Sequence, residues 1–328
     1  MQRSLVLCIL CISFHLKSVA QPSRSGPAKS DTIFLADPTI FTDKGMHYLY
    51  GTGSNKGFLV YQSADLKNWE GPVGKRNGHA LLQGESYGSK GFWAPQVFRH
   101  NKKYYMAYTA DENIAIAESD SPLGPFVQKE LKAIAGAGKQ IDPFIFMDNG
   151  KIYLYHVRLT NGNRIYVAQM KNDLSDIESG TAVECISAAS QPWENTANAT
   201  WPVAEGPTVI RRNKLYYLFY SANDFRNIDY AVGYATSVSP WGPWKKYENN
   251  PVISRKLLNV NGPGHGDFFN GTDGDLRYVF HAHNSSSKVS PRSTVIIKSK
   301  FIKAKGQPDK LTVDTGSFSF LRTNMPSN

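Results

Sequence analysis

The segments DPTIFTDKGMHYLY (37–50) and DPFIFMDNGKIYLY (142–155) lie far apart in the chain but follow one pattern. Each begins with an apolar run, continues through a polar turn that contains glycine, and ends with a run rich in tyrosine. Two such runs joined by a short turn are typical of a β-hairpin. The design occurs three more times, in WAPQVFRHNKKYYMAY (93–108), EGPTVIRRNKLYYLFY (205–220) and, more loosely, DFFNGTDGDLRYVFH (267–281).

The five copies also share a register. In each copy a tyrosine stands ten residues after one reference position, which is Pro38, Pro95, Pro143, Pro207 or Phe268. A further strand-like segment follows every copy, at 58–70, 114–126, 164–174, 232–244 and 293–303. Repeats of this length, each with about four antiparallel strands, indicate the blades of a propeller. The alternative, a β-sandwich, does not explain five matching registers.

We therefore predict an all-β fold, namely a single five-bladed β-propeller over residues 31–328. The segment LTVDTGSFSF (311–320) is the predicted strand that closes the ring. In a propeller the first strand of every blade lines a central channel, so equivalent residues of different copies meet at one end of that channel.

The N-terminus has the pattern of an export signal. A basic start at Arg3 precedes the apolar run Leu5–Phe14, and small residues follow at 18–20. The run is too short to span a bilayer, so we predict a cleaved signal peptide at 1–20 and a flexible leader at 21–30. This predicts a periplasmic or extracellular protein.

Charge and composition argue against a nucleic-acid-binding protein and against a membrane-spanning one. The formal net charge is +10, but the lysines and arginines are scattered through turns, which favours a solvated surface over a nucleic-acid site. No segment after the signal is apolar for long enough to span a membrane. Cleavage would leave Cys185 as the single cysteine, so no internal disulfide is expected. Nothing in the sequence indicates an obligate protein partner.

Three acids occupy the axial position of the repeat. Asp37 and Asp142 stand directly before the reference proline, and Glu205 stands one residue earlier in its copy. Each signal is weak alone, because Asp-Pro is a common turn dipeptide and Glu-Gly-Pro recurs at 70–72 away from the axis. Together they predict three converging carboxylates. Glycoside hydrolysis uses one carboxylic acid to protonate the leaving oxygen and one carboxylate to activate water.

Several short motifs along the chain resemble those of one known enzyme family. They cover nearly all of the chain after the signal, and they are ADPTIF at Asp37, SADLKNWE (63–70), FWAPQVF (92–98), SPLGPF (121–126), IDPFIF at Asp142, AEGPTVI at Glu205 and GPGHGDFF (262–269). On these motifs the chain resembles glycoside hydrolase family 43. That resemblance implies a five-bladed propeller that hydrolyses glycosidic bonds with inversion of the anomeric centre.

The resemblance also implies roles. Asp37 would be the general base, Asp142 would orient the acid and set its pKa, and Glu205 would be the general acid. An inverting site leaves room for water, so we expect the carboxyls of Asp37 and Glu205 to lie roughly 6.5–9.5 Å apart. His265 matches a histidine near the channel centre, often beside calcium or its water. Either a water-coordinated Ca²⁺ or bonds to neighbours and substrate would account for His265.

Substrate contacts are predicted with alternatives. Trp93 and Trp201 would either stack on sugar rings or fill space between blades. Arg292 would either reach a sugar hydroxyl or be an exposed arginine. One departure from the family pattern is Gln96, which stands where an acid often follows the FWAP motif.

We expect the substrate to be an oligosaccharide or polysaccharide of plant type, from which a terminal furanose or pentose is released. The compact single propeller, without the sandwich domain of many xylosidases, favours an α-L-arabinofuranosidase. A β-xylosidase or a galactofuranosidase of the same family is the alternative within this class. A non-catalytic sugar-binding propeller is the alternative of another class, and three intact acids argue against it. Fructan-hydrolysing propellers carry different motifs at the three acid positions.

Overall fold

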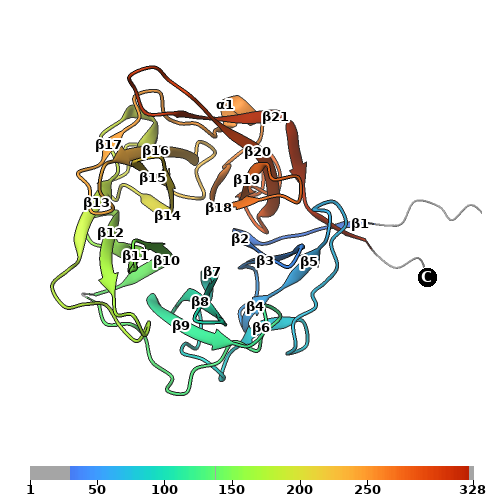
Figure 1. Ribbon diagram of the computed structural model, residues 1–328. Coiled ribbons are helices and arrows are strands. Elements are labelled where there is room, and N and C mark those ends of the chain that lie inside the picture. The colour runs from blue at the N-terminus through green and yellow to red at the C-terminus, as the bar shows by residue number, and fades with distance from the viewer. Residues whose placement is uncertain (1–29, 137, 325–328) are drawn as a thin grey trace, which may run out of the picture.

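The structure, a computed structural model, describes residues 30–136 and 138–324. Five sheets stand around a central axis like the blades of a propeller, as Figure 1 shows. The predicted all-β, five-bladed fold is confirmed. The predicted signal peptide at 1–20 and most of the leader at 21–30 lie outside the described residues. Among the described residues, no helix has the length and apolarity needed to cross a bilayer.

Each blade is an antiparallel meander that runs outward from the axis. The innermost strands are β2 (Ala36–Asp43), β7 (Trp93–His100), β10 (Gln140–Asp148), β14 (Ala204–Arg212) and β18 (Gly264–Asn270). The second strands are β3 (Met46–Thr52), β8 (Lys103–Ala110), β11 (Lys151–Leu159), β15 (Leu215–Ala222) and β19 (Leu276–Ala282). The third strands are β5 (Tyr61–Ser63), β9 (Asn113–Ser119), β12 (Asn163–Met170), β16 (Ala231–Ser237) and β20 (Ser293–Ile302).

The outer parts of the blades differ. Blades 3, 4 and 5 have a fourth strand, which is β13 (Val183–Ser187), β17 (Lys245–Lys246) and β21 (Lys310–Phe320), respectively. In blade 1 a separate two-stranded sheet joins β4 (Gly57–Leu59) to β6 (His79–Leu82). Two short helical segments complete the described elements: the 3₁₀ turn η1 (Pro192–Glu194) and α1 (Arg255–Leu258).

The prediction for ring closure is wrong. The segment 311–320 forms most of β21, which pairs with β20 as the outer strand of blade 5. The ring is closed instead by β1 (Ser30–Thr32), which pairs with β22 (Arg322–Asn324), as Figure 1 shows where the two ends of the described chain run side by side. The backbone of Asn324 also donates to the carbonyl of Trp69 in blade 1. The short strands β1 and β22 therefore close the ring, and the longer strand β21 does not. From the sequence alone, the longer segment is the expected one.

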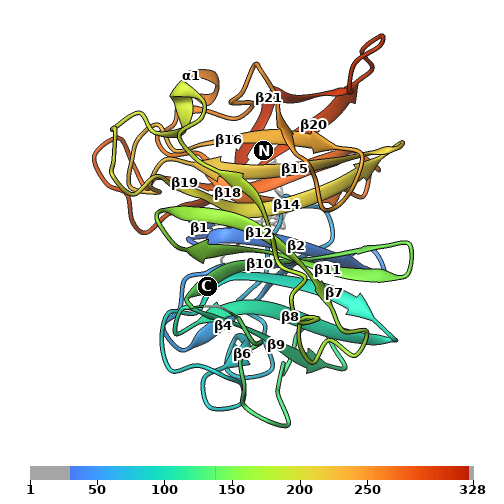
Figure 2. The ribbon, with the colours of Figure 1, turned by 90° about the vertical axis from the view of Figure 1, so that its left-hand side faces the viewer.

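Equivalent tyrosines join blade 1 to blade 2 and blade 3 to blade 4. The Tyr50 hydroxyl at the end of β3 donates to the carbonyl of Pro122 in blade 2, at 2.5 Å. The equivalent Tyr155 of blade 3 donates to the carbonyl of Pro240 in blade 4, also at 2.5 Å. Both tyrosine rings are buried between blades. Figure 2, which views the molecule from the side, shows the blades stacked around the ring. These two tyrosines therefore connect neighbouring blades by hydrogen bonds.

Every innermost strand has a β-bulge at its start. One residue in each bulge has a left-handed backbone, with φ of 49° at Asp37, 46° at Ala94, 56° at Asp142, 60° at Gly206 and 44° at His265. A positive φ is unfavourable for residues other than glycine, and a bulge re-aims the side chain next to it. The five bulges form the rim of the channel, and this rim carries the candidate site.

The bulges correct the register predicted for blade 5. Gly266, not Phe268, takes the position of the prolines, because His265 is the bulged residue. Asp267 therefore matches Thr39 of blade 1 and lies one step below the rim. The ten-residue spacing misplaced it because the β18–β19 turn, 271–275, is longer than the turn of blade 1.

Candidate active site

The three acids predicted to converge do meet at the rim. Asp37, Asp142 and Glu205 come from blades 1, 3 and 4, and all three side chains are buried. His265 Nδ1 lies 3.4 Å from Asp37 Oδ1 and 3.8 Å from Asp142 Oδ2, so one ring nitrogen is close to both acids. The backbone N–H of Gly206, next to Glu205, donates to Asp142 Oδ2 at 3.1 Å.

Asp37 is surrounded by groups that favour its ionised form. Arg292 Nη1 donates to Oδ1 at 3.0 Å, and Thr52 Oγ1 donates to Oδ2 at 2.7 Å. Burial raises the pKa of Asp37, but Arg292, His265 and His281 outweigh it and hold the pKa well below its usual value. The carboxylate therefore stays charged and can accept a proton from water.

The pKa of Glu205 is shifted in the opposite direction, upward. Burial raises its pKa to about 7, and the charge of Asp37 adds to that rise. Tyr230 donates to Oε1 at 2.8 Å and Asn163 donates to Oε2 at 2.9 Å, and both bonds limit the shift. A carboxyl with a pKa near neutrality can be protonated while Asp37 is ionised, as an acid and base pair requires.

The third acid, Asp142, interacts with both Asp37 and Glu205. Burial, reinforced by the negative charges of Glu205 and Asp37, raises the pKa of Asp142 well above its usual value. Its backbone N–H donates to Thr109 Oγ1 at 2.9 Å, and its Oδ2 accepts the Gly206 N–H. Asp142 therefore fixes the backbone beside Glu205, in keeping with the orienting role expected for it.

The two predicted tryptophans lie at the surface rather than between blades. Trp93 begins β7 and is 38% exposed, and Trp201 precedes β14 and is 47% exposed. The space-filling alternative is therefore wrong for both, while stacking on sugar stays a prediction. Arg292 is not an exposed arginine, because its side chain is 13% exposed, contacts Asp37 and lies 4.6 Å from the centre of the Phe225 ring.

A second layer of side chains lies below the rim. Asp267 Oδ2 accepts the Thr39 hydroxyl at 2.8 Å, and Asp267 Oδ1 accepts the Thr208 hydroxyl at 2.9 Å. Gln96, which replaces the acid of the family pattern, bonds both the N–H and the carbonyl of Ile145. The cavity between the rim and this layer has about 20 Å³, enough for a single water molecule. Gln96 thus ties blade 2 to blade 3 at the wall of this cavity.

Sequence reasoning missed four residues of the site. Tyr230 and Asn163 bond Glu205, and Thr52 and His281 contact Asp37. Thr52 and His281 come from second strands of the blades, near the axis, so a closer reading of the repeat could have found them. Asn163 is the first residue of β12 and Tyr230 directly precedes β16, so both lie at the start of third strands, for which no shared register was predicted.

Comparison with known proteins identifies the family. The family described as "Glycosyl hydrolases family 43" matches residues 32–308. The chain belongs to this family. A solved structure described as an endo-1,4-beta-xylanase from Bacteroides thetaiotaomicron is 40% identical, with a TM-score of 0.81, and the match covers 90% of this chain and 99% of that one. An endo-arabinase structure from the same organism is 28% identical, with a TM-score of 0.69, over 83% of this chain and 95% of that chain.

Curated relatives of this family 43 chain differ in the activity their names give. A non-reducing end alpha-L-arabinofuranosidase of Bacteroides ovatus is 25% identical over 81% of this chain and 48% of its own length. A probable arabinan endo-1,5-alpha-L-arabinosidase of Aspergillus fumigatus is 24% identical over 78% of this chain and 80% of its own. The chain spans about half the length of the first of these relatives.

The residues around His265 do not provide a direct metal site. Within 30–136 and 138–324, no group of three or more His, Cys, Asp or Glu side chains is arranged to hold a metal ion. Calcium takes six to eight oxygen ligands, whereas the oxygens nearest His265 belong to Asp37 and Asp142, which already accept other bonds. A calcium ion held mainly by water stays a prediction.

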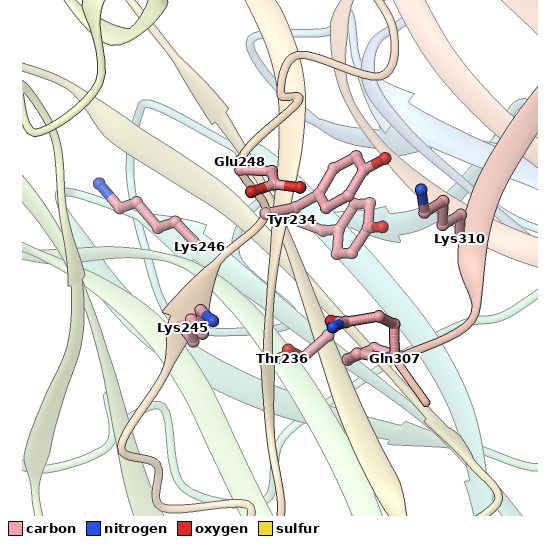
Figure 3. Close-up of a pocket in the computed structure, with 9 residues that line it drawn as sticks. Tyr234, Thr236, Lys245, Lys246, Glu248, Gln307 and Lys310 are labelled. Atoms are coloured by element: carbon pink, nitrogen blue, oxygen red, sulfur yellow. The ribbon is translucent and has the colours of Figure 1, made fainter. Parts of the chain in front are cut away.

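A larger hollow lies away from the axis, beside β16, β17 and the β20–β21 connection (Figure 3). Its volume is about 330 Å³, and its polar lining includes Tyr234, Thr236, Lys245, Lys246, Glu248, Gln307 and Lys310. Glu248 is the single carboxylate in that lining. Glycoside hydrolysis requires a pair of carboxylates, so this hollow is not the hydrolytic site of the family 43 chain.

Proposed function

We propose that this chain is an inverting glycoside hydrolase that releases terminal α-L-arabinofuranose from plant-type oligosaccharides or polysaccharides. The observation that carries the proposal is the opposite tuning of two buried carboxyls at one rim. Asp37 is kept ionised beside Arg292, while burial raises the pKa of Glu205 to about 7. One side chain can then accept a proton while the other donates one.

In the proposed reaction, Asp37 takes a proton from a water molecule as the water oxygen attacks the anomeric carbon. Glu205 gives its proton to the glycosidic oxygen, whose bond to the anomeric carbon breaks. The products are the free sugar with inverted configuration and the shortened chain, and proton exchange with solvent restores both acids. Asp142 takes no proton from the substrate in this scheme; it holds the Gly206 backbone and so orients Glu205. Trp93 and Trp201 are the proposed sugar platforms at the rim.

A xylose-releasing activity is the second candidate. It is favoured by the 40% identical structure, whose name refers to a β-1,4-xylan substrate. Xylose and arabinose are both pentoses, and the acid and base pair would act identically on either. The choice between them therefore depends on loops around the rim rather than on the three acids. We also propose that the protein is exported, on the pattern of residues 1–20.

The test is a set of nitrophenyl glycosides, followed by proton NMR of the first-formed product. We expect the arabinofuranoside to be cleaved faster than the xyloside and the galactofuranoside, and the released sugar to have the opposite anomeric configuration. Retention of configuration would contradict the inverting scheme and the expected carboxyl separation of roughly 6.5–9.5 Å. Binding of oligosaccharides without hydrolysis of any glycoside would favour the sugar-binding alternative.

A further inference from the structure

A chain of hydrogen bonds runs from the surface to the proposed acid. Trp201 Nε1 donates to Asn163 Oδ1 at 2.9 Å, and Asn163 Nδ2 donates to Glu205 Oε2 at 2.9 Å. On the other side of the same carboxyl, Tyr230 is 2.8 Å from Oε1. Each oxygen of Glu205 therefore has one fixed polar neighbour.

The chemistry of these groups sets the direction of every bond. An indole N–H only donates, so the amide atom that faces Trp201 must be the oxygen of Asn163. The amide nitrogen of Asn163 then faces Glu205, and it too only donates. Glu205 Oε2 is thereby held as an acceptor. A tyrosine hydroxyl both donates and accepts, so Tyr230 tolerates Oε1 with or without a proton.

We propose that Trp201 and Asn163 are positioning residues that confine the acidic proton of Glu205 to Oε1, from which the leaving oxygen of the sugar is protonated. The last clause rests on the proposed hydrolase function. Trp201 thus has a second task besides offering a face to sugar, because its indole N–H selects which oxygen of the acid carries the proton.

Backbone contacts hold Trp201 and Asn163 in place beside Glu205. The N–H of Asn163 donates to the carbonyl of Pro202 at 3.0 Å, and Asn163 forms a bridge with Val203, two residues before Glu205. Gly162 allows this approach, since a Cβ there would lie 2.6 Å from the same carbonyl. Trp201, Asn163 and Glu205 therefore belong to two adjoining segments that cannot slide apart without breaking these contacts.

The sign of the expected pH effect follows from the bond. A donor to a carboxylate stabilises its charged form and lowers its pKa. Loss of the fixed Asn163 contact therefore raises the pKa of Glu205, so the acid stays protonated to higher pH. The other ionisable or charged groups around Glu205 are Asp37 on β2, Asp142 on β10, Arg292 before β20, the phenol of Tyr230 and His265 on β18, whose ring lies against Gly206. None of these is changed by a substitution at Trp201 or Asn163.

The decisive variant is Trp201→Phe, which keeps an aromatic face but removes the indole N–H. We expect the alkaline limb of its kcat profile to move up by about half a pH unit, and that of Asn163→Leu by about one. Trp93→Phe is the matched control. It alters the other rim tryptophan, whose indole is not the one bonded to Asn163, so KM can change while the alkaline limb stays in place.

A second readout does not need activity. In protein labelled with ¹³C at glutamate carboxyls, the Glu205 resonance, assigned with Glu205→Gln, reports its titration directly. An upward shift of its midpoint in Trp201→Phe and Asn163→Leu supports the proton assignment even if no glycoside is hydrolysed, in which case only the proposed function fails. If the parent hydrolyses glycosides and neither variant moves the limb or the midpoint, the proposal is overturned.

Discussion

Asp37 and Asp267 are carboxyls near the start of inner strands; Asp37 is buried at the rim, and Asp267 is partly buried in the layer below. Asp37 contacts Arg292, and its pKa is held well below the usual value. Asp267 is bonded only by the hydroxyls of Thr39 and Thr208 and the N–H of Phe268, and burial raises its pKa despite them. Burial alone pushes a carboxyl toward its neutral form, and a nearby cation is needed to keep a buried base charged.

The same contrast exists within the rim. Arg292 bonds Asp37 directly, whereas Glu205 has two neutral donors, Tyr230 and Asn163. Burial therefore prevails at Glu205 and raises its pKa to about 7. The position of one guanidinium separates the base from the acid. Substitutions of the two acids, and of the groups that set their pKa values, test this contrast.

The largest effects are expected from Glu205→Gln and Asp37→Asn, each lowering kcat by about 10²–10⁴-fold. They differ in how they respond to the leaving group. Dinitrophenyl glycosides leave with little protonation, so they should be partly spared by Glu205→Gln and not by Asp37→Asn. Steady-state kinetics with nitrophenyl and dinitrophenyl substrates measure the difference.

The matched control is Glu70→Gln. Glu70 begins the same Glu-Gly-Pro tripeptide as Glu205, but it is exposed and bonds the side chain of Gln62. Its replacement should leave kcat and KM unchanged. Parent-like rates in both Glu205→Gln and Asp37→Asn would show that these acids are not the catalytic pair.

The repeat explains why the acids were predictable from sequence. Asp37 and Asp142 occupy equivalent bulges, and Glu205 precedes the glycine of a third, so a single register places all of them at one rim. The family motifs led to the same residues. Asp267 was misplaced because an insertion in a hairpin turn changes the count without changing the blade.

The residues that tune the two carboxyls were harder to predict, because they lie at the start of third strands or on connections, where no shared register was predicted. Arg292 could be read equally as an exposed arginine, since nothing in the pattern before β20 shows that it reaches blade 1. Asn163 begins β12 and Trp201 lies on the connection before β14, and the fold brings the two together. Sequence periodicity fixes the inner strands, while pairwise contacts between connecting segments depend on the assembled ring.

A smaller effect is expected from Arg292→Gln. Without the guanidinium, the pKa of Asp37 rises, so the base becomes protonated at higher pH and the acid limb of the rate profile moves up by about one unit or more. Arg292 also lowers the pKa of Glu205, so the alkaline limb should move in the same direction. The pH dependence of kcat/KM measures both limbs.

Arg226→Gln is the control for this change. Arg226 also lies beside the Phe225 ring, at 5.7 Å, but it is mostly exposed and pairs with Asp224. Its removal should leave both limbs in place. A lower rate for Arg292→Gln with unmoved limbs would mean that Arg292 acts by binding sugar and not by setting the charge of Asp37.

The smallest effect on catalysis is expected from Asp267→Asn. The amide keeps one acceptor oxygen, and the Thr39 hydroxyl can turn to accept from the new NH₂ group, so about 1 kcal/mol of stability should be lost at low pH. The folded pKa of Asp267 is above the unfolded value of 3.8. The parent's stability therefore falls as pH rises from that value through the folded pKa, because only the unfolded chain gains the favourable ionisation. Asparagine removes this loss, so the difference in stability between the variant and the parent should narrow with rising pH.

Urea denaturation at several pH values measures this difference in stability, and rate profiles should show both limbs unmoved. A shift of the acid limb in Asp267→Asn would mean that the lower layer shares its charge with Asp37, and the separation between the two layers would then fail.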